Sequence, residues 1–93
     1  MKFERDDAKS DNCFAERGFD FDYAIRVFLD PHRMIRQEER KSYGEERYQL
    51  FGRIDERLFV IVFTYRSAAI RIISARKANA REVKAYEVAS GKN

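Results

Sequence analysis

The spacing of apolar residues predicts helices at both ends of the chain and strands between them. Near the N-terminus, Asp6 or Asp7 as a cap and Gly18 as a stop predict a short first helix. Residues 20–31 predict a second helix that Pro31 ends. Its apolar side chains recur at i, i+3, i+4 and i+7 and should face the core; they are Phe21, Ala24, Ile25 and Phe28.

From about residue 33 to residue 76 the pattern changes to that of β-strands. Four short runs are rich in β-branched and aromatic residues, namely HRMIRQEER, ERYQLFGRI, RLFVIVFTY and AIRIISAR. Their connections, KSYGE, DE and SA, are short, which predicts an antiparallel meander of four strands. The third run, Leu58 to Tyr65, is apolar on both alternating sets, so it should lie centrally and be covered on both faces.

The last strand and the C-terminal segment complete the predicted fold. Alternation gives the last strand two faces, Ile70, Ile72 and Ser74 on one side and Arg71, Ile73 and Ala75 on the other. Asn79 and Glu82 form a capping box that starts a final helix in NAREVKAYEVASG. We therefore predict an α+β fold with two N-terminal helices, a four-stranded antiparallel meander sheet and a C-terminal helix. Residues 1–93 form a single domain, of which 90–93 are a flexible tail.

Composition narrows the class of protein. The chain has 93 residues, of which 44% are hydrophobic, enough for one modest core. Its one cysteine, Cys13, has no Cys or His at metal-ligand spacing, so we expect a buried thiol, no metal and a reducing compartment. No apolar run is long enough to span a membrane and the N-terminus lacks a signal-peptide pattern, so we expect a cytoplasmic protein with no membrane partner.

Charge is distributed unevenly along the chain. Residues 1–30 contain five Lys and Arg against eight Asp and Glu, whereas residues 31–93 contain fourteen against eight. From Arg57 to Arg81 there are six bases and no acid. This segment suits an anionic ligand such as RNA, DNA or an acidic protein, and we hypothesise that acids are missing because its arginines must stay free for phosphate. The alternative is a solvated basic surface.

A few side chains are candidates for chemistry, although common enzyme motifs are absent. Arg66 and Arg76 lie at strand ends, and arginine is the side chain best able to grip phosphate with two parallel donors. The single histidine, His32, opens the first strand and would titrate near neutral pH, unless it is structural. Glu45 and Arg47 share one face of the second strand, where an ion pair is the alternative to a functional role.

Three stretches carry a resemblance to a known family. They are FERDDAKSDNCFAERGFDFDYAIRVFLDP, YGEERYQLFGRI and IRIISARKANAREVKAYE. Together they resemble the BrnT toxins, which belong to the broader RelE-like superfamily of toxin–antitoxin ribonucleases. The resemblance runs from Phe3 to about Glu87, and its most specific pieces, VF.DP, GE.R and RIISAR.A...E, keep the order and spacing of the family.

The resemblance implies a RelE-like fold and a small ribonuclease that needs no metal or other cofactor. When free, such a toxin blocks translation. It is held inactive by a cognate DNA-binding, BrnA-like antitoxin, so DNA is contacted only through that partner. Many relatives carry Lys-His just before the helix-ending glycine, where this chain has Glu16 and Arg17. Any chemistry of that imidazole therefore falls to His32 or another group, or the activity is altered.

This reading assigns roles to the candidate residues. RNA cleavage without metal uses the 2′-hydroxyl as an internal nucleophile, so the protein must bind the phosphate and move protons. We assign Arg66 and Arg76 to the phosphate, and His32 and Glu45 to proton transfer. The predicted RNA-binding residues are Arg71, Tyr65, Lys77 and Arg47; the tyrosine would stack on a base, unless it belongs to the core. The alternative function is a non-catalytic basic module that binds an acidic partner or nucleic acid.

Overall fold

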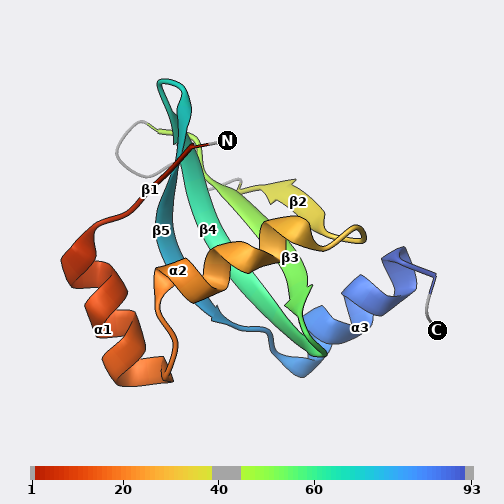
Figure 1. Ribbon diagram of the computed structural model, residues 1–93. Coiled ribbons are helices and arrows are strands. Elements are labelled where there is room, and N and C mark those ends of the chain that lie inside the picture. The colour runs from red at the N-terminus through yellow and green to blue at the C-terminus, as the bar shows by residue number, and fades with distance from the viewer. Residues whose placement is uncertain (1, 39–44, 92–93) are drawn as a thin grey trace.

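The computed structural model describes residues 2–38 and 45–91 and shows an α+β fold, as predicted (Figure 1). Its elements are β1 (Lys2–Glu4), α1 (Asp7–Arg17), α2 (Phe21–Ala24), the 3-10 helix η1 (Ile25–Leu29), β2 (Met34–Gln37), β3 (Tyr48–Ile54), β4 (Arg57–Arg66), β5 (Ala69–Lys77) and α3 (Ala80–Ala89). The end of the first predicted strand with most of the connection after it (39–44), and the end of the predicted tail (92–93), lie outside the described residues.

The strands form one sheet in the order β1-β5-β4-β3-β2. Strands β2 to β5 are the predicted antiparallel meander, and β4 is central as expected. The prediction of four strands, all antiparallel, is wrong at the other edge, where β1 pairs parallel with β5 from Lys2–Ala69 to Glu4–Arg71. A three-residue strand is too short to show alternation, and no short connection in the sequence indicates its distant partner.

The N-terminal helices cover one side of the sheet (Figure 1). The side chain of Asp6 caps α1 by accepting from the backbone N–H of Lys9, and Gly18 ends it with φ of 84°, both as predicted. The second predicted helix is α-helical only over α2 and continues as η1. This segment lies close to β3, because a Cβ atom at Gly52 would stand 2.8 Å from the carbonyl oxygen of Val27.

Helix α3 lies near the end of β3 and β4 that is farthest from β1 (Figure 1). Asn79 and Glu82 form the predicted capping box, in which each side chain accepts from the other residue's backbone N–H. The helix ends at Ala89, and Ser90, the first residue of the predicted tail, is its C-cap, with its backbone N–H bonded to the carbonyl of Tyr86. The last helix is therefore predicted correctly, including its first turn.

The core consists of two clusters separated by the sheet. The larger cluster lies under α1, α2 and η1; its sheet residues include Leu50, Phe59, Ile61, Phe63, Ile70, Ile72 and Ala75. The smaller cluster lies on the opposite side, where α3 packs; it contains Phe51, Leu58, Val60 and Tyr86. Alternate residues of β4 thus enter different clusters, which confirms that this strand is covered on both faces.

A bulge in β5 changes the predicted faces of that strand. Phe63 pairs with Ile72, whereas the preceding Val62 pairs with Ser74, so Ile73 has no partner across the strands. The prediction that Ser74 shares a face with Ile72 is therefore wrong. Ala75 lies with Ile72 in the larger cluster, and the residues of β5 after the bulge exchange sides.

Two further expectations concern Cys13 and membrane segments. The thiol is buried, and its Sγ lies 3.6 Å from the carbonyl oxygen of Ala75, to which it donates. Burial raises the pKa of Cys13, as expected for a structural thiol. Across the described residues, no helix is both long and apolar enough to cross a membrane.

Candidate functional site

Arginines from several strands gather on the side of the sheet that bears the smaller cluster. Arg36 pairs across the strands with Gln49 and donates to its side chain at 3.0 Å, while Arg76 pairs with Val60 of the smaller cluster. We call this set the arginine face; its members are Arg36, Arg47, Arg66, Arg71 and Arg76. α3 packs on only one end of this side, so each of these arginines keeps some exposure to solvent.

Glu45 lies between two arginines of this face. Its Oε2 is 3.8 Å from Nη2 of Arg47, and its Oε1 is 3.9 Å from Nη2 of Arg66. Both distances exceed those of hydrogen bonds, so the ion pairs are loose. Glu45 and Arg47 do lie together, as their spacing predicted, although β3 itself begins at Tyr48.

Arg76 is held by a pair of short hydrogen bonds. Its Nη1 and Nη2 donate to Oε1 and Oε2 of Glu82, each at 2.8 Å. This paired hydrogen bond raises the pKa of Arg76 and lowers that of Glu82, so both groups stay charged. Arg36 also contributes to the lowered pKa of Glu82, which places it near the same carboxylate.

Arg71 completes the group of arginines paired with acids. Its Nη1 is 3.9 Å from Oε1 of Glu4 in β1. The hypothesis that the acid-free segment keeps its arginines free of carboxylates is therefore wrong. Folding brings acids to it from β1, from the segment before β3 and from α3, which a count along the sequence does not reveal.

Tyr65 and Lys77 lie on the opposite side of the sheet from the arginine face. Tyr65 is 59% exposed and makes edge-to-face contacts with the rings of Tyr48 and Phe63, so it is not a core residue. Lys77 lines a groove near the end of α1 together with Phe14, Arg17 and other residues. The structure therefore brings Arg47, Arg66, Arg71, Arg76 and Glu45 to one face and leaves these two side chains outside it.

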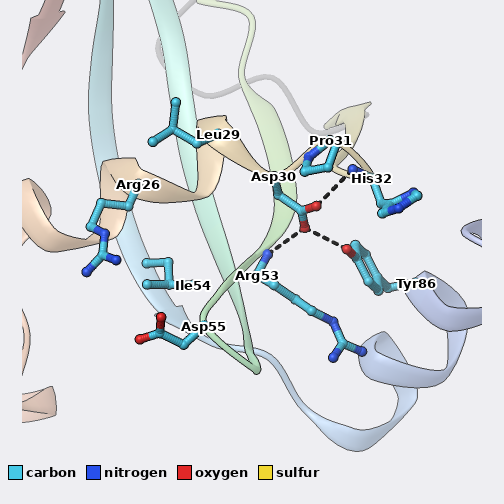
Figure 2. Close-up of a pocket in the computed structure, with 9 residues that line it drawn as sticks. All are labelled: Arg26, Leu29, Asp30, Pro31, His32, Arg53, Ile54, Asp55 and Tyr86. Atoms are coloured by element: carbon cyan, nitrogen blue, oxygen red, sulfur yellow. Dashed lines mark hydrogen bonds between the residues drawn. The ribbon is translucent and has the colours of Figure 1, made fainter.

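A buried carboxylate, for which the sequence predicted no role, links three elements at the end of the sheet near α3 (Figure 2). Asp30 accepts from the hydroxyl of Tyr86 at 2.6 Å and from the backbone N–H of Arg53 at 2.7 Å, and its other oxygen accepts from the backbone N–H of His32 at 2.8 Å. We call these four residues the Asp30 network. They line an open depression of about 480 Å³.

The titration of this network follows from its hydrogen bonds. Burial pushes the pKa of Asp30 upward, but the bonds from Tyr86, Arg53 and His32 outweigh it, and the net shift is downward. Burial and the bond to Asp30 raise the pKa of Tyr86 to about 12. Arg53 lies within β3, where its guanidinium bonds to Glu87 at 3.2 Å and lies over the ring of Tyr86.

His32 lies in the turn before β2 and lines this depression rather than the arginine face (Figure 2). Within the described chain, no contact joins its side chain to Arg66 or Arg76. Its backbone N–H, not its imidazole, makes the hydrogen bond to Asp30. The structure thus separates the two residues predicted to transfer protons, since Glu45 lies beside Arg66.

The comparison with protein families decides the class of this protein. The model of the ribonuclease toxin BrnT of type II toxin–antitoxin systems matches residues 6–82. The chain belongs to this family. A search of curated proteins finds no match to the chain.

Membership in the BrnT family gives the chain a ribonuclease toxin class and a protein antitoxin as partner. The matched range contains the whole arginine face, Glu45 and Glu82, whereas Tyr86 follows it. Glu16 and Arg17, which stand in place of the Lys-His pair, lie at the end of α1 and so on the side opposite the arginine face. In the described ranges, no three His, Cys, Asp or Glu residues cluster as metal ligands would.

Proposed function

We propose that this protein is a toxin that cuts RNA on the arginine face and uses no metal ion or other cofactor. The observation that carries the proposal is the strand register, which collects arginines from separate strands on one side of the sheet that α3 covers only in part. Clustered guanidinium groups suit a phosphate-rich ligand. The BrnT family supplies the class of reaction.

The proposed reaction is an internal displacement. The 2′-oxygen attacks the neighbouring phosphorus, the bond from phosphorus to the 5′-oxygen breaks, and a cyclic phosphate remains on one fragment. Glu45 accepts the proton of the 2′-hydroxyl, because its carboxylate lies beside Arg66 and is partly exposed. The leaving 5′-oxygen takes a proton from water. Arg66 and Arg76 stabilise the charge that develops on the phosphate, with Arg71 as a weaker contact.

The remaining predicted residues have smaller parts in this proposal. Arg47 would contact the RNA backbone beside Glu45. Exposed Tyr65 would stack on an RNA base at the end of β4, whereas Lys77, at the opposite end of β5, would contact a more distant phosphate. His32 stays a prediction for proton transfer and is the less favoured candidate, since it lines a different surface from the arginines.

The proposal includes a specific partner and setting. A cognate, DNA-binding, BrnA-like antitoxin would hold the toxin inactive by covering the arginine face with an acidic segment, and DNA would be contacted only through it. Free toxin would block translation in the cytoplasm, and residues 1–93 would act as a single domain. Co-purification of toxin with its genetic neighbour tests the partner. Full recovery of harmless, uncomplexed toxin would contradict it.

Arginine variants test the site. We expect Arg66→Ala and Arg76→Ala each to slow cleavage of a bulk RNA substrate by about 10²–10³-fold, as removal of one preorganised donor typically does. Arg57→Ala is the matched control, because Arg57 is exposed and has no ion-pair partner among the described residues. EDTA should leave cleavage unchanged. Equal losses in all three variants would indicate diffuse attraction, and intact RNA with a folded wild-type protein would favour the non-catalytic module.

A further inference from the structure

Glu82 has a second role besides capping α3. We propose that it is a positioning residue, which holds one edge of the Arg76 guanidinium so that the other edge is presented to an RNA phosphate. This inference rests on the proposed function and adds to it a residue that the sequence indicated only as a helix cap. Its basis is the way in which the hydrogens of Arg76 are shared among acceptors.

A guanidinium group has two forks of parallel N–H donors. Glu82 occupies the end-on fork of Arg76, since Nη1 and Nη2 each donate to one carboxylate oxygen at 2.8 Å. The second hydrogen of Nη1 points toward the carbonyl oxygen of Lys77 at 3.3 Å. Within the described part of the chain, Nε and the outer hydrogen of Nη2 have no acceptor, and Nε is not sealed from solvent. These two hydrogens form the side-on fork, which matches two oxygens of a phosphate.

The carboxylate that holds Arg76 is itself fixed. Oε1 of Glu82 also accepts from the backbone N–H of Asn79 at 2.9 Å, and the Glu82 side chain is only 17% exposed. The turn that carries it is anchored because Val83 and Tyr86 pack into the smaller cluster. Arg76 is therefore tied to a rigid helix start, and little conformational entropy remains to be lost when a phosphate binds.

The local charge also favours positioning over blocking. Arg36 lies on the same side of the sheet as Arg76, and its charge also lowers the pKa of Glu82, so two guanidinium groups outweigh this one carboxylate. A carboxylate that blocked the site would occupy both forks or neutralise the cluster. Here it leaves one fork and one positive charge for the substrate.

The test compares Glu82→Gln with Glu87→Gln in the full chain. In Glu82→Gln the amide keeps an oxygen for the Asn79 N–H and so preserves the cap, but the charge and the second acceptor for Arg76 are lost. We expect about a tenfold loss of cleavage rate with Glu82→Gln, a typical coupling for residues in direct contact. Glu87→Gln is the matched control on the same helix, because Glu87 pairs with Arg53, which belongs to the Asp30 network and has no assigned contact with RNA. Thermal midpoints of both variants show whether folding is affected.

A binding measurement separates positioning from a merely structural role. The probe is a short RNA whose 2′-hydroxyls are replaced by methoxy groups, so that it binds but cannot be cut. We expect Glu82→Gln to weaken binding about tenfold when Arg76 is present and to have no effect in an Arg76→Ala background. An equal loss in both backgrounds would overturn the inference. Tighter binding by Glu82→Gln would also overturn it, since the carboxylate would then be a competitor of phosphate.

The inference and the proposed function fail in different ways. If Arg76→Ala cuts RNA as fast as the wild type, the proposed site is wrong. If Arg76→Ala is inactive while Glu82→Gln behaves as the wild type, the site stands and the positioning role of Glu82 is wrong.

Discussion

The Asp30 network and the arginine face both place charged groups on the sheet, but they differ in how fully their polar atoms are used. Asp30 is 8% exposed and accepts three hydrogen bonds no longer than 2.8 Å. Glu45, beside the arginine face, is partly exposed, and its contacts with Arg47 and Arg66 are 3.8 and 3.9 Å long. Saturated, buried polar groups stabilise a fold, whereas loosely paired, solvated groups can exchange their partners for a ligand.

Arg76 lies between these two extremes. It is held as tightly as Asp30 on one edge, yet its other edge is open. Arg76 therefore combines a fixed position with a donor pair that no acceptor among the described residues uses, as we propose for an arginine that binds phosphate. Four predictions test the contrast between the two regions.

The largest effect should come from Asp30→Ala. Removal of this carboxylate leaves the buried hydroxyl of Tyr86 and the N–H of Arg53 without an acceptor, which we expect to lower the free energy of unfolding by about 3–5 kcal/mol. Urea denaturation measures it. Asp30→Asn keeps an acceptor and should lose less, so it serves if the alanine variant does not fold. Wild-type stability in both variants would show that the network does not stabilise the fold.

The decrease in the free energy of unfolding at alkaline pH should depend on Tyr86. Its pKa is raised to about 12, above that of an unfolded tyrosine, so folding favours the neutral phenol. This contribution is fully present below about pH 10 and is lost as the pH rises through about 12, a loss of roughly 2–3 kcal/mol at about 1.4 kcal/mol per pH unit. Urea titrations of the wild type and Tyr86→Phe from about pH 8 to about pH 11 test this. Parallel curves for the two proteins would contradict the expected coupling.

A smaller effect is expected at Arg71 of the arginine face. Its ion pair with Glu4 is loose, so it can contribute charge to RNA binding without a fixed geometry. We expect Arg71→Ala to slow cleavage about tenfold with an unchanged thermal midpoint. Ile73 lies at the bulge of the same strand, and Ile73→Val, as the control, should change the cleavage rate by less than about twofold. A large drop in the thermal midpoint of Arg71→Ala would indicate that Arg71 has a structural role.

The smallest effect is expected at His32, because it belongs to the Asp30 network and not to the arginine face. The hydrogen bond from His32 to Asp30 comes from its backbone N–H, and alanine keeps that group. We therefore expect His32→Ala to change the cleavage rate by less than about threefold and to leave the pH–rate profile unaltered. Glu45→Gln is the comparison and should shift the acid limb of that profile. A hundredfold loss of cleavage rate for His32→Ala would show that the imidazole takes part in the reaction.

Much of the fold could be predicted because its signals are local. The caps at Asp6, Gly18 and Asn79 each act within one helical turn, and the two-residue connections force antiparallel neighbours. The second helix was predicted where it lies, but not its change to 3-10 geometry against Gly52, which depends on contact with β3. The parallel strand β1 and the bulge at Ile73 depend on pairing between distant segments, so no window of sequence contains their cause.

In the candidate site, too, features with local signals could be predicted and features that depend on distant contacts could not. Arg66, Arg71, Arg76 and Glu45 could be selected from the sequence, because arginines between apolar strand residues already indicate a basic surface. Which carboxylate pairs with which arginine could not be predicted, since the contacts of Arg66 with Glu45, Arg71 with Glu4 and Arg76 with Glu82 depend on how the strands and α3 pack. The hydrogen bonds of Asp30 could not be predicted, because its partners Arg53 and Tyr86 are far away in the chain.

The order of residues was enough to predict the helix ends, the meander, the central position of β4, the basic character of residues 57–81 and the resemblance to the BrnT family. These features follow from short-range chemistry and from composition, which a linear chain displays directly. Which arginines share a face, which carboxylates hold them and which polar groups are buried in the Asp30 network became known from the folded structure. The reason is that register and burial set the distances between charges, and neither is encoded within a single element.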